Sequence, residues 1–118
     1  MVSSMLGASL AILGPQYIPK LKQRLLNPDG FSAVELLNLV QDPQADQEIR
    51  GSSIDGLVKK ATHATPEGFF ARTTLRQLAF YEEIKAGDSD GEVLYLSKGY
   101  VPNKETIAHA KKALQLTA

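Results

Sequence analysis

The chain has no cysteine among its 118 residues. This absence excludes a disulfide framework, thiolate catalysis and zinc sites built on cysteine, and it fits a reducing compartment. Neither sign of charge is in excess, because thirteen basic residues balance thirteen acidic ones. The protein as a whole therefore has no field that attracts nucleic acid or an anionic membrane, and a partner of either kind would have to bind at a local patch.

Charge of either sign is also absent from the first nineteen residues. We expect a helix over residues 3–13, ended by Gly14 and Pro15, with bulky apolar side chains on one side. The opposite side carries small residues at i, i+3, i+4 and i+7, which are Ser4, Gly7, Ala8 and Ala11. Neither side is suited to water. We therefore expect the helix to be covered by another chain or by small residues of the final helix, Ala110 and Ala113.

The uncharged start lacks the features of a targeting or membrane segment. A signal peptide carries basic residues ahead of its apolar run, whereas the first cation here is Lys20. The apolar run from Met5 to Leu13 is also far shorter than the ~20 residues that span a bilayer. We therefore expect a cytoplasmic protein without a membrane span.

Capping residues, prolines and glycines divide the rest of the chain into helices. Ser32 and Glu35 have the spacing of a capping box and predict a core helix behind them. Asp42 and Gly51 frame a short polar helix, and the two serines after Gly51 supply the cap of the next one. Further helices are expected over residues 19–27 and 104–116.

The longest helix is expected to begin at Thr65 and Pro66 and to run to about Ala86. Its apolar residues, Phe80 among them, leave only a narrow polar strip. Such a pattern is typical of a central helix with others packed around it.

One segment differs from this helical pattern. Residues 92–101 are rich in β-branched and aromatic side chains and predict a small β-hairpin that turns at residues 98–99. The fold class predicted for the chain is mainly α. It is a single domain over residues 1–118, an irregular multi-helix bundle around the helix over residues 66–86, with the hairpin packed on it.

Groups suited to catalysis or metal binding are sparse. His63 and His109 are isolated in the sequence, and Glu82 and Glu83 are adjacent on a helix, where neighbouring side chains point about 100° apart. The acidic loop over residues 88–93 has the core of a calcium loop, but alanine and serine stand where the first and last ligands should be. No glycine-rich phosphate-binding motif occurs. We therefore expect no catalytic residue, no metal and no cofactor.

Two arginines of the long helix form the start of a basic patch. Arg72 and Arg76 are four residues apart, and like charges at this spacing repel each other unless an anionic group is near. We expect each to have a carboxylate partner or to point into solvent. The alternative is a contact with an anion or with nucleic acid, in which Lys59 and Lys60 would extend the basic surface.

The short helices between residues 32 and 63 also allow a helix-turn-helix interpretation. The candidate recognition helix is poorly suited to it, because Asp55 and Gly56 stand where base-reading side chains would be expected.

No pattern in the sequence specifies a reaction. The function we predict is that of a non-enzymatic interaction or structural subunit, which self-associates or docks on a larger assembly through its uncharged N-terminal helix. Its partner would be a second copy of the chain or another protein. A nucleic-acid-binding helical module that uses the local basic patch is the alternative, and an enzyme whose site is assembled from scattered residues is the third interpretation.

Overall fold

The computed structural model describes residues 14–88 and 94–117. Most of these residues are helical and none of them forms a strand, so the mainly α fold predicted from the sequence is confirmed. The helix predicted over residues 3–13 lies outside the described residues. In chain order the elements are η1 (Pro15–Tyr17), α3 (Ile18–Arg24), η2 (Pro28–Gly30), α4 (Ala33–Gln41), α5 (Gln47–Ala61), α6 (Pro66–Ala79), α7 (Tyr81–Glu83), η3 (Ile84–Asp88) and α8 (Lys104–Thr117).

The described chain begins with a turn that glycine and proline impose. Gly14 has a φ of 89°, a conformation that glycine adopts without strain, and Pro15 follows it at the first position of η1. α3 then places Leu21 and the residue after its end, Leu25, in the core. A turn at Gly14 and Pro15 is therefore present, and the helix predicted over residues 19–27 is present but ends earlier, at Arg24.

The start of α4 has the capping box that the sequence predicts. Ser32 Oγ accepts a hydrogen bond from the Glu35 N–H (3.1 Å), and Glu35 Oε1 accepts one from the Ser32 N–H (2.8 Å). Behind this cap, Leu36 and Val40 have no exposed surface. The prediction of a core helix after Ser32 is therefore confirmed.

The two helices predicted between Asp42 and residue 63 are a single helix, α5. Asp42 does not begin a helix, because its N–H bonds to the carbonyl of Leu39 at the end of α4. The cap of α5 is Asp46, whose Oδ1 accepts a hydrogen bond from the Ile49 N–H (2.8 Å).

Gly51 and Ser53 lie inside α5 rather than at a boundary, for reasons that involve packing. A Cβ at Gly51 would lie 3.3 Å from the His109 ring, so glycine allows α8 to approach closely at this point. The Ser53 hydroxyl is buried and donates to the carbonyl of Ile49 one turn earlier (2.7 Å). Neither residue is therefore available to stop or cap a helix.

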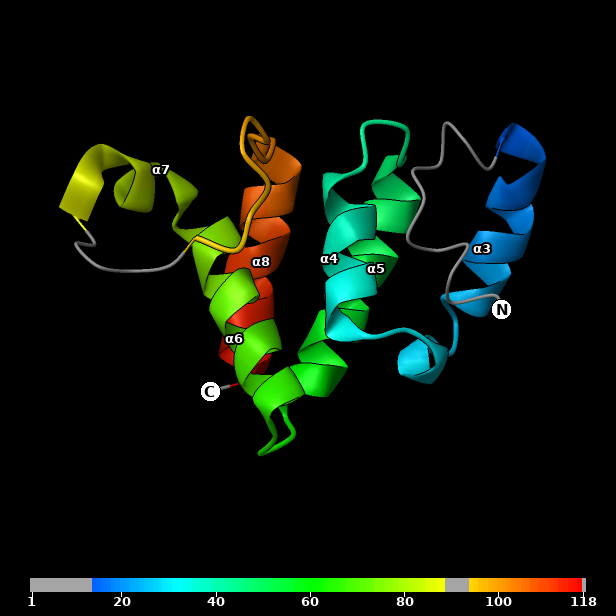
Figure 1. Cartoon of the computed structure of the whole chain (residues 1–118), viewed down its shortest axis with the longest axis horizontal. Helices are drawn as coiled ribbons and strands as arrows, with labels where there is room; N and C mark the ends of the chain where they lie inside the picture. The colour runs from blue at the N-terminus through cyan, green and yellow to red at the C-terminus, as the bar shows by residue number, and fades with distance from the viewer. Residues whose placement is uncertain (1–13, 89–93, 118) are drawn as a thin grey trace.

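The helix that begins at Thr65 is shorter than predicted. Thr65 Oγ1 accepts a hydrogen bond from the Gly68 N–H (3.0 Å), which confirms the start, but α6 ends at Ala79 instead of near Ala86. Phe80 has φ −116° and ψ 35°, and Figure 1 shows α7 turned away from the axis of α6. None of residues 80–86 is buried, so tertiary packing does not hold them on that axis.

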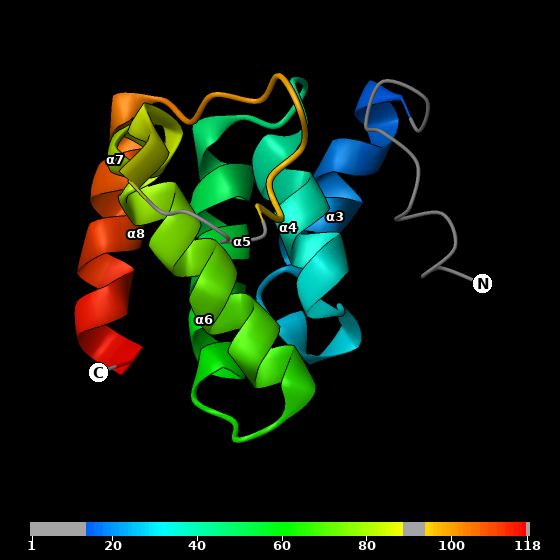
Figure 2. The ribbon, with the colours of Figure 1, turned by 60° about the vertical axis from the view of Figure 1, so that its left-hand side comes forward.

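The central position belongs to α5 and not to the helix over residues 66–86. α5 packs against α3, η2, α4, α6 and α8, and its Ile49, Ile54 and Leu57 have no exposed surface. α6 covers α5 from another side and also packs against α8 and α4. Figures 1 and 2 both show α3 and α8 at opposite ends of the bundle.

The β-hairpin predicted near residues 92–101 is wrong for the part that the structure describes. The turn at residues 98–99 is present, with Gly99 at φ 88° and the Tyr100 N–H bonded to the Ser97 carbonyl (3.1 Å). The backbone that precedes this turn forms hydrogen bonds with side chains and not with a second strand. The N–H of Tyr95 donates to Gln77 Oε1 (2.9 Å), and that of Ser97 donates to Gln41 Oε1.

The last helix, α8, follows its predicted bounds. Asn103 Oδ1 accepts a hydrogen bond from the Thr106 N–H (2.8 Å), as expected of an N-cap. Its buried stripe is Thr106, Ala110 and Ala113, and the partly buried Leu114 packs against the core. No helix in the described part of the chain has both the length and the apolar character of a membrane span.

Candidate functional site

The small residues predicted to contact a partner, Ser4, Gly7, Ala8 and Ala11, lie outside the described residues. Their predicted intramolecular partners can be placed. Ala110 and Ala113 are 0% and 2% exposed, and they lie on α8, which packs against α5 and α6. Ala110 and Ala113, the two α8 residues that the intramolecular alternative requires as partners, are therefore core residues.

The four cations predicted to form a basic patch occupy the end of α5 and the body of α6. Lys60 Nζ lies 3.7 Å from Glu67 Oε1, and its side chain is only 13% exposed. Arg72 Nη1 donates to the carbonyls of Ala61 (2.6 Å) and His63 (3.1 Å). Lys59 and Arg76 are exposed. Lys60 and Arg72 are thus engaged within the fold.

The contacts of Arg72 explain its position. The last carbonyls of an α-helix have no intrahelical partner, and they lie at the negative end of the helix dipole. The Arg72 guanidinium supplies both donors and positive charge to the C-terminal end of α5. Its partners are backbone carbonyls, whereas from the sequence we expected a carboxylate partner or a position pointing into solvent.

Glu67 connects three helices at the same end of the bundle. Its Oε2 accepts a hydrogen bond from the Ala33 N–H at the start of α4 (2.8 Å), and its Oε1 pairs with Lys60 of α5. The following residue, Gly68, is so close to the preceding loop that a Cβ there would lie 2.0 Å from the His63 carbonyl oxygen. This junction therefore depends on close packing that only glycine permits.

The isolated histidines have different surroundings. His63 is exposed, whereas His109 Nε2 lies 2.8 Å from Asp55 Oδ1 and links α8 to α5. Among the described residues no group of three side chains suited to metal coordination comes together. Of the acidic loop, residues 89–93 lie outside the part of the chain that the structure describes.

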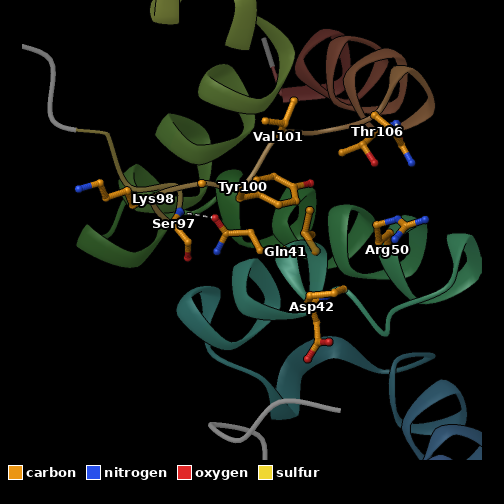
Figure 3. A pocket seen from close by; sticks show the side chains of 12 residues that line it. Gln41, Asp42, Arg50, Ser97, Lys98, Tyr100, Val101 and Thr106 are labelled. Atoms are coloured by element: carbon orange, nitrogen blue, oxygen red, sulfur yellow. Dashed lines mark hydrogen bonds between the residues drawn. The ribbon is translucent and has the colours of Figure 1, made fainter. Parts of the chain in front are cut away.

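The structure contains a cleft that the sequence did not predict. It has a volume of about 470 Å³ and lies between the end of α4, the N-terminal half of α5, the turn at residues 97–101 and the start of α8 (Figure 3). Its polar lining includes Arg50, Tyr100, Thr106, Lys98 and Asp42. These residues come from four separate segments, so no sequence motif brings them together.

Two of the lining side chains have polar atoms that are buried without a hydrogen-bond partner. They are Arg50 Nε and Thr106 Oγ1. Arg50 Nη1 donates to the Ala45 carbonyl (2.6 Å), which fixes the guanidinium in place. Thr106 has no exposed surface. Groups of this kind usually have partners in native proteins, so each one requires an explanation.

Tyr100 stands next to both of these groups. Burial raises the pKa of the Tyr100 phenol above its ordinary value of 10.0, while the Arg50 charge and the Thr106 hydroxyl lower it. Figure 3 shows the phenolic oxygen pointing to the side of the cleft on which Arg50 and Thr106 lie. The phenol stays protonated near neutral pH and can donate a hydrogen bond.

Comparison of the chain with models of protein families, with curated proteins and with solved structures finds no match.

Proposed function

We propose that the protein is a non-enzymatic interaction subunit that self-associates through its uncharged N-terminal segment. The observation that carries this proposal is the complete absence of charged side chains before Lys20 in a chain that is otherwise well supplied with them. Ser4, Gly7, Ala8 and Ala11 would form the contact between two copies. Small side chains at this spacing allow two helix backbones to approach closely.

The place where the segment joins the bundle supports a contact between chains. Residues 1–13 are connected to η1 and α3, whereas Ala110 and Ala113 belong to α8 at the opposite end (Figures 1 and 2). Both alanines already pack in the core. To pack on Ala110 and Ala113 of its own chain, the N-terminal segment would therefore have to cross the bundle. It would then meet two side chains that are already buried.

The contacts of the cations lend less support to nucleic-acid binding. Such binding would need Lys59, Lys60, Arg72 and Arg76 to meet phosphates together. Lys60 is paired with Glu67, and Arg72 is bonded to the end of α5. Engaging them with phosphates would break contacts that hold α5 and α6 together.

The test is the molar mass of the full chain in solution over a range of concentrations. The informative variant is Ala8→Glu, because a charge within an interface between chains should give a folded monomer. Gln16→Glu is the matched control, since it adds the same charge at an exposed position of η1. A self-association that persists in Ala8→Glu would overturn the proposal.

A further inference from the structure

We propose that the surface between α4 and α6 is a binding groove for a leucine-containing peptide of a partner protein, and that residues 94–97 of the chain itself occupy this groove as an internal ligand. We call residues 94–97 the strap. The strap and the two helices belong to the described part of the chain, so the inference does not depend on the N-terminal contact proposed above.

The backbone of the strap is held by two glutamine side chains. Gln77 Oε1, on α6, accepts a hydrogen bond from the N–H of Tyr95 (2.9 Å). Gln41 Oε1, at the end of α4, accepts one from the N–H of Ser97 (Figure 3). Every residue except proline carries a backbone N–H, so these two acceptors can hold a foreign peptide as well as the strap.

Gln77 is an unusual residue for the position it occupies. It has no exposed surface, although glutamine is mostly found on protein surfaces. Burying an amide side chain is costly unless hydrogen bonds replace its contacts with water. A leucine at this position of α6 would fill the core without that cost. We therefore interpret Gln77 as a group that serves to bind a peptide backbone.

Side chains of the strap add specificity to these two hydrogen bonds. Leu96 is only 5% exposed and belongs to the hydrophobic core, whereas Tyr95 and Ser97 on either side of it are exposed. The Tyr95 ring packs on that of Phe70 of α6, with 4.9 Å between the ring centroids. A peptide suited to the groove therefore has a leucine that enters the core and an aromatic residue directly before it.

The strap can be exchanged for such a peptide without a loss of secondary structure. The described part of the chain has no strand, so the strap lacks the ladder of backbone hydrogen bonds that holds an edge strand in a sheet. While it is bound, the strap competes with a partner peptide as a tethered ligand, at an effective concentration on the order of 1 mM. The strap therefore keeps the affinity for partner peptides low until it is displaced.

The experiment measures, by fluorescence anisotropy, the binding of a fluorescein-labelled synthetic peptide with the sequence of residues 94–100 to the full chain. In Leu96→Ala the strap loses the side chain that anchors it in the core. We expect the peptide to bind this variant at least about tenfold more tightly than the natural chain. Val101→Ala is the matched control, because it shortens an aliphatic side chain that is 66% exposed, and it should bind like the natural chain.

Two further comparisons locate the binding in the groove. A peptide with aspartate in place of the leucine that corresponds to Leu96 should not bind. Adding Gln41→Ala to Leu96→Ala should raise the Kd of the peptide about tenfold, because it removes the acceptor at the end of α4. Adding Gln23→Ala instead removes an exposed amide of α3 and should leave the Kd unchanged.

Two results would overturn the proposal. The first is a folded Leu96→Ala variant that binds the peptide no more tightly than the natural chain does. The second is equal binding of the leucine and aspartate peptides, which would mean that the peptide adsorbs without a specific groove. If Leu96→Ala fails to fold, Ser97→Pro gives the same comparison with the same expected and contradicting results, because it removes the N–H bonded to Gln41 and leaves Leu96 in place.

Discussion

The guanidinium of Arg72 lies 2.6 Å from the carbonyl oxygen of Ala61, so a side chain of α6 terminates α5. The two helices are consecutive in the sequence, and Arg72 also bonds to the His63 carbonyl in the loop between them. Arg72, which suggested ligand binding when only the sequence was considered, therefore has a structural role.

Replacing Arg72 with Met should lower the free energy of unfolding by about 1.5–3 kcal/mol, because it removes charge-assisted hydrogen bonds and keeps most of the apolar stem. Arg76→Met is the matched control on the exposed side of α6, and its effect should stay below about 1 kcal/mol. Urea denaturation measures both. Equal effects of the two variants would contradict the role assigned to Arg72.

Gly68→Ala should be strongly destabilising, by about 1–3 kcal/mol or more, because the added Cβ would lie 2.0 Å from the His63 carbonyl oxygen. Gly30→Ala provides the control, since no atom lies within 4 Å of a Cβ built there and its φ is not positive. That variant should be neutral or more stable by up to about 1 kcal/mol. Thermal unfolding of the two variants gives the comparison, and a tolerated Gly68→Ala would mean that α6 does not pack against the loop as described.

Leu78→Ala should cost about 2–5 kcal/mol, because Leu78 has no exposed surface in the core. Phe80→Ala should cost clearly less, since Phe80 is 40% exposed and lies where α6 has already ended. From the sequence we expected Phe80 to be buried in a long helix. Chemical denaturation that gives the two variants the same loss of stability would restore that expectation and remove the break after Ala79.

The pair of Lys22 and Asp46 should make stability depend on pH in the acid range. Lys22 Nζ lies 2.8 Å from Asp46 Oδ2, and this contact, with the hydrogen bond from the Ile49 N–H, holds the pKa of Asp46 below its ordinary value of 3.8. A carboxyl group with a lowered pKa in the folded state stabilises it above the ordinary value. That contribution is lost as the pH falls through the folded-state pKa.

Asp46→Asn isolates this effect, because Asn keeps the N-cap of α5 and loses the charge. Near neutral pH the natural protein should be the more stable of the two, and the difference should shrink as the pH falls below 3.8. Circular dichroism melts across this range measure it. A difference that stays constant throughout would show that the charge of Asp46 contributes nothing.

Local signals account for the parts of the fold that the sequence predicted correctly. The capping box of Ser32, the Asn103 cap and the turn at Gly14 depend on residues within a few positions of one another. The errors involve distant contacts. Gly51 resembles a helix end in the sequence, but it is the site at which His109 of α8 packs on α5. The sequence has no glycine or proline at Phe80 that would predict the break there.

The cleft could not be predicted because its key residues are far apart in the chain. Arg50 belongs to α5, Tyr100 follows a turn, and Thr106 stands at the start of α8. One signal was available: Thr106 is a polar residue on the buried stripe of α8, four residues before Ala110. A hydroxyl at such a position needs a partner, and only the tertiary structure shows that the Tyr100 phenol lies beside it.

The most direct test of the proposed self-association is the molar mass of the natural chain and of Ala8→Glu, measured by light scattering together with their melting curves. We predict that the natural chain has a mass above the 12.8 kDa of one copy, rising with concentration. Ala8→Glu should be a folded monomer, and Gln16→Glu should behave like the natural chain. A monomeric natural chain, or an Ala8→Glu variant that loses its cooperative melting transition, would contradict the account, because the small residues would then belong to the interior of a single chain.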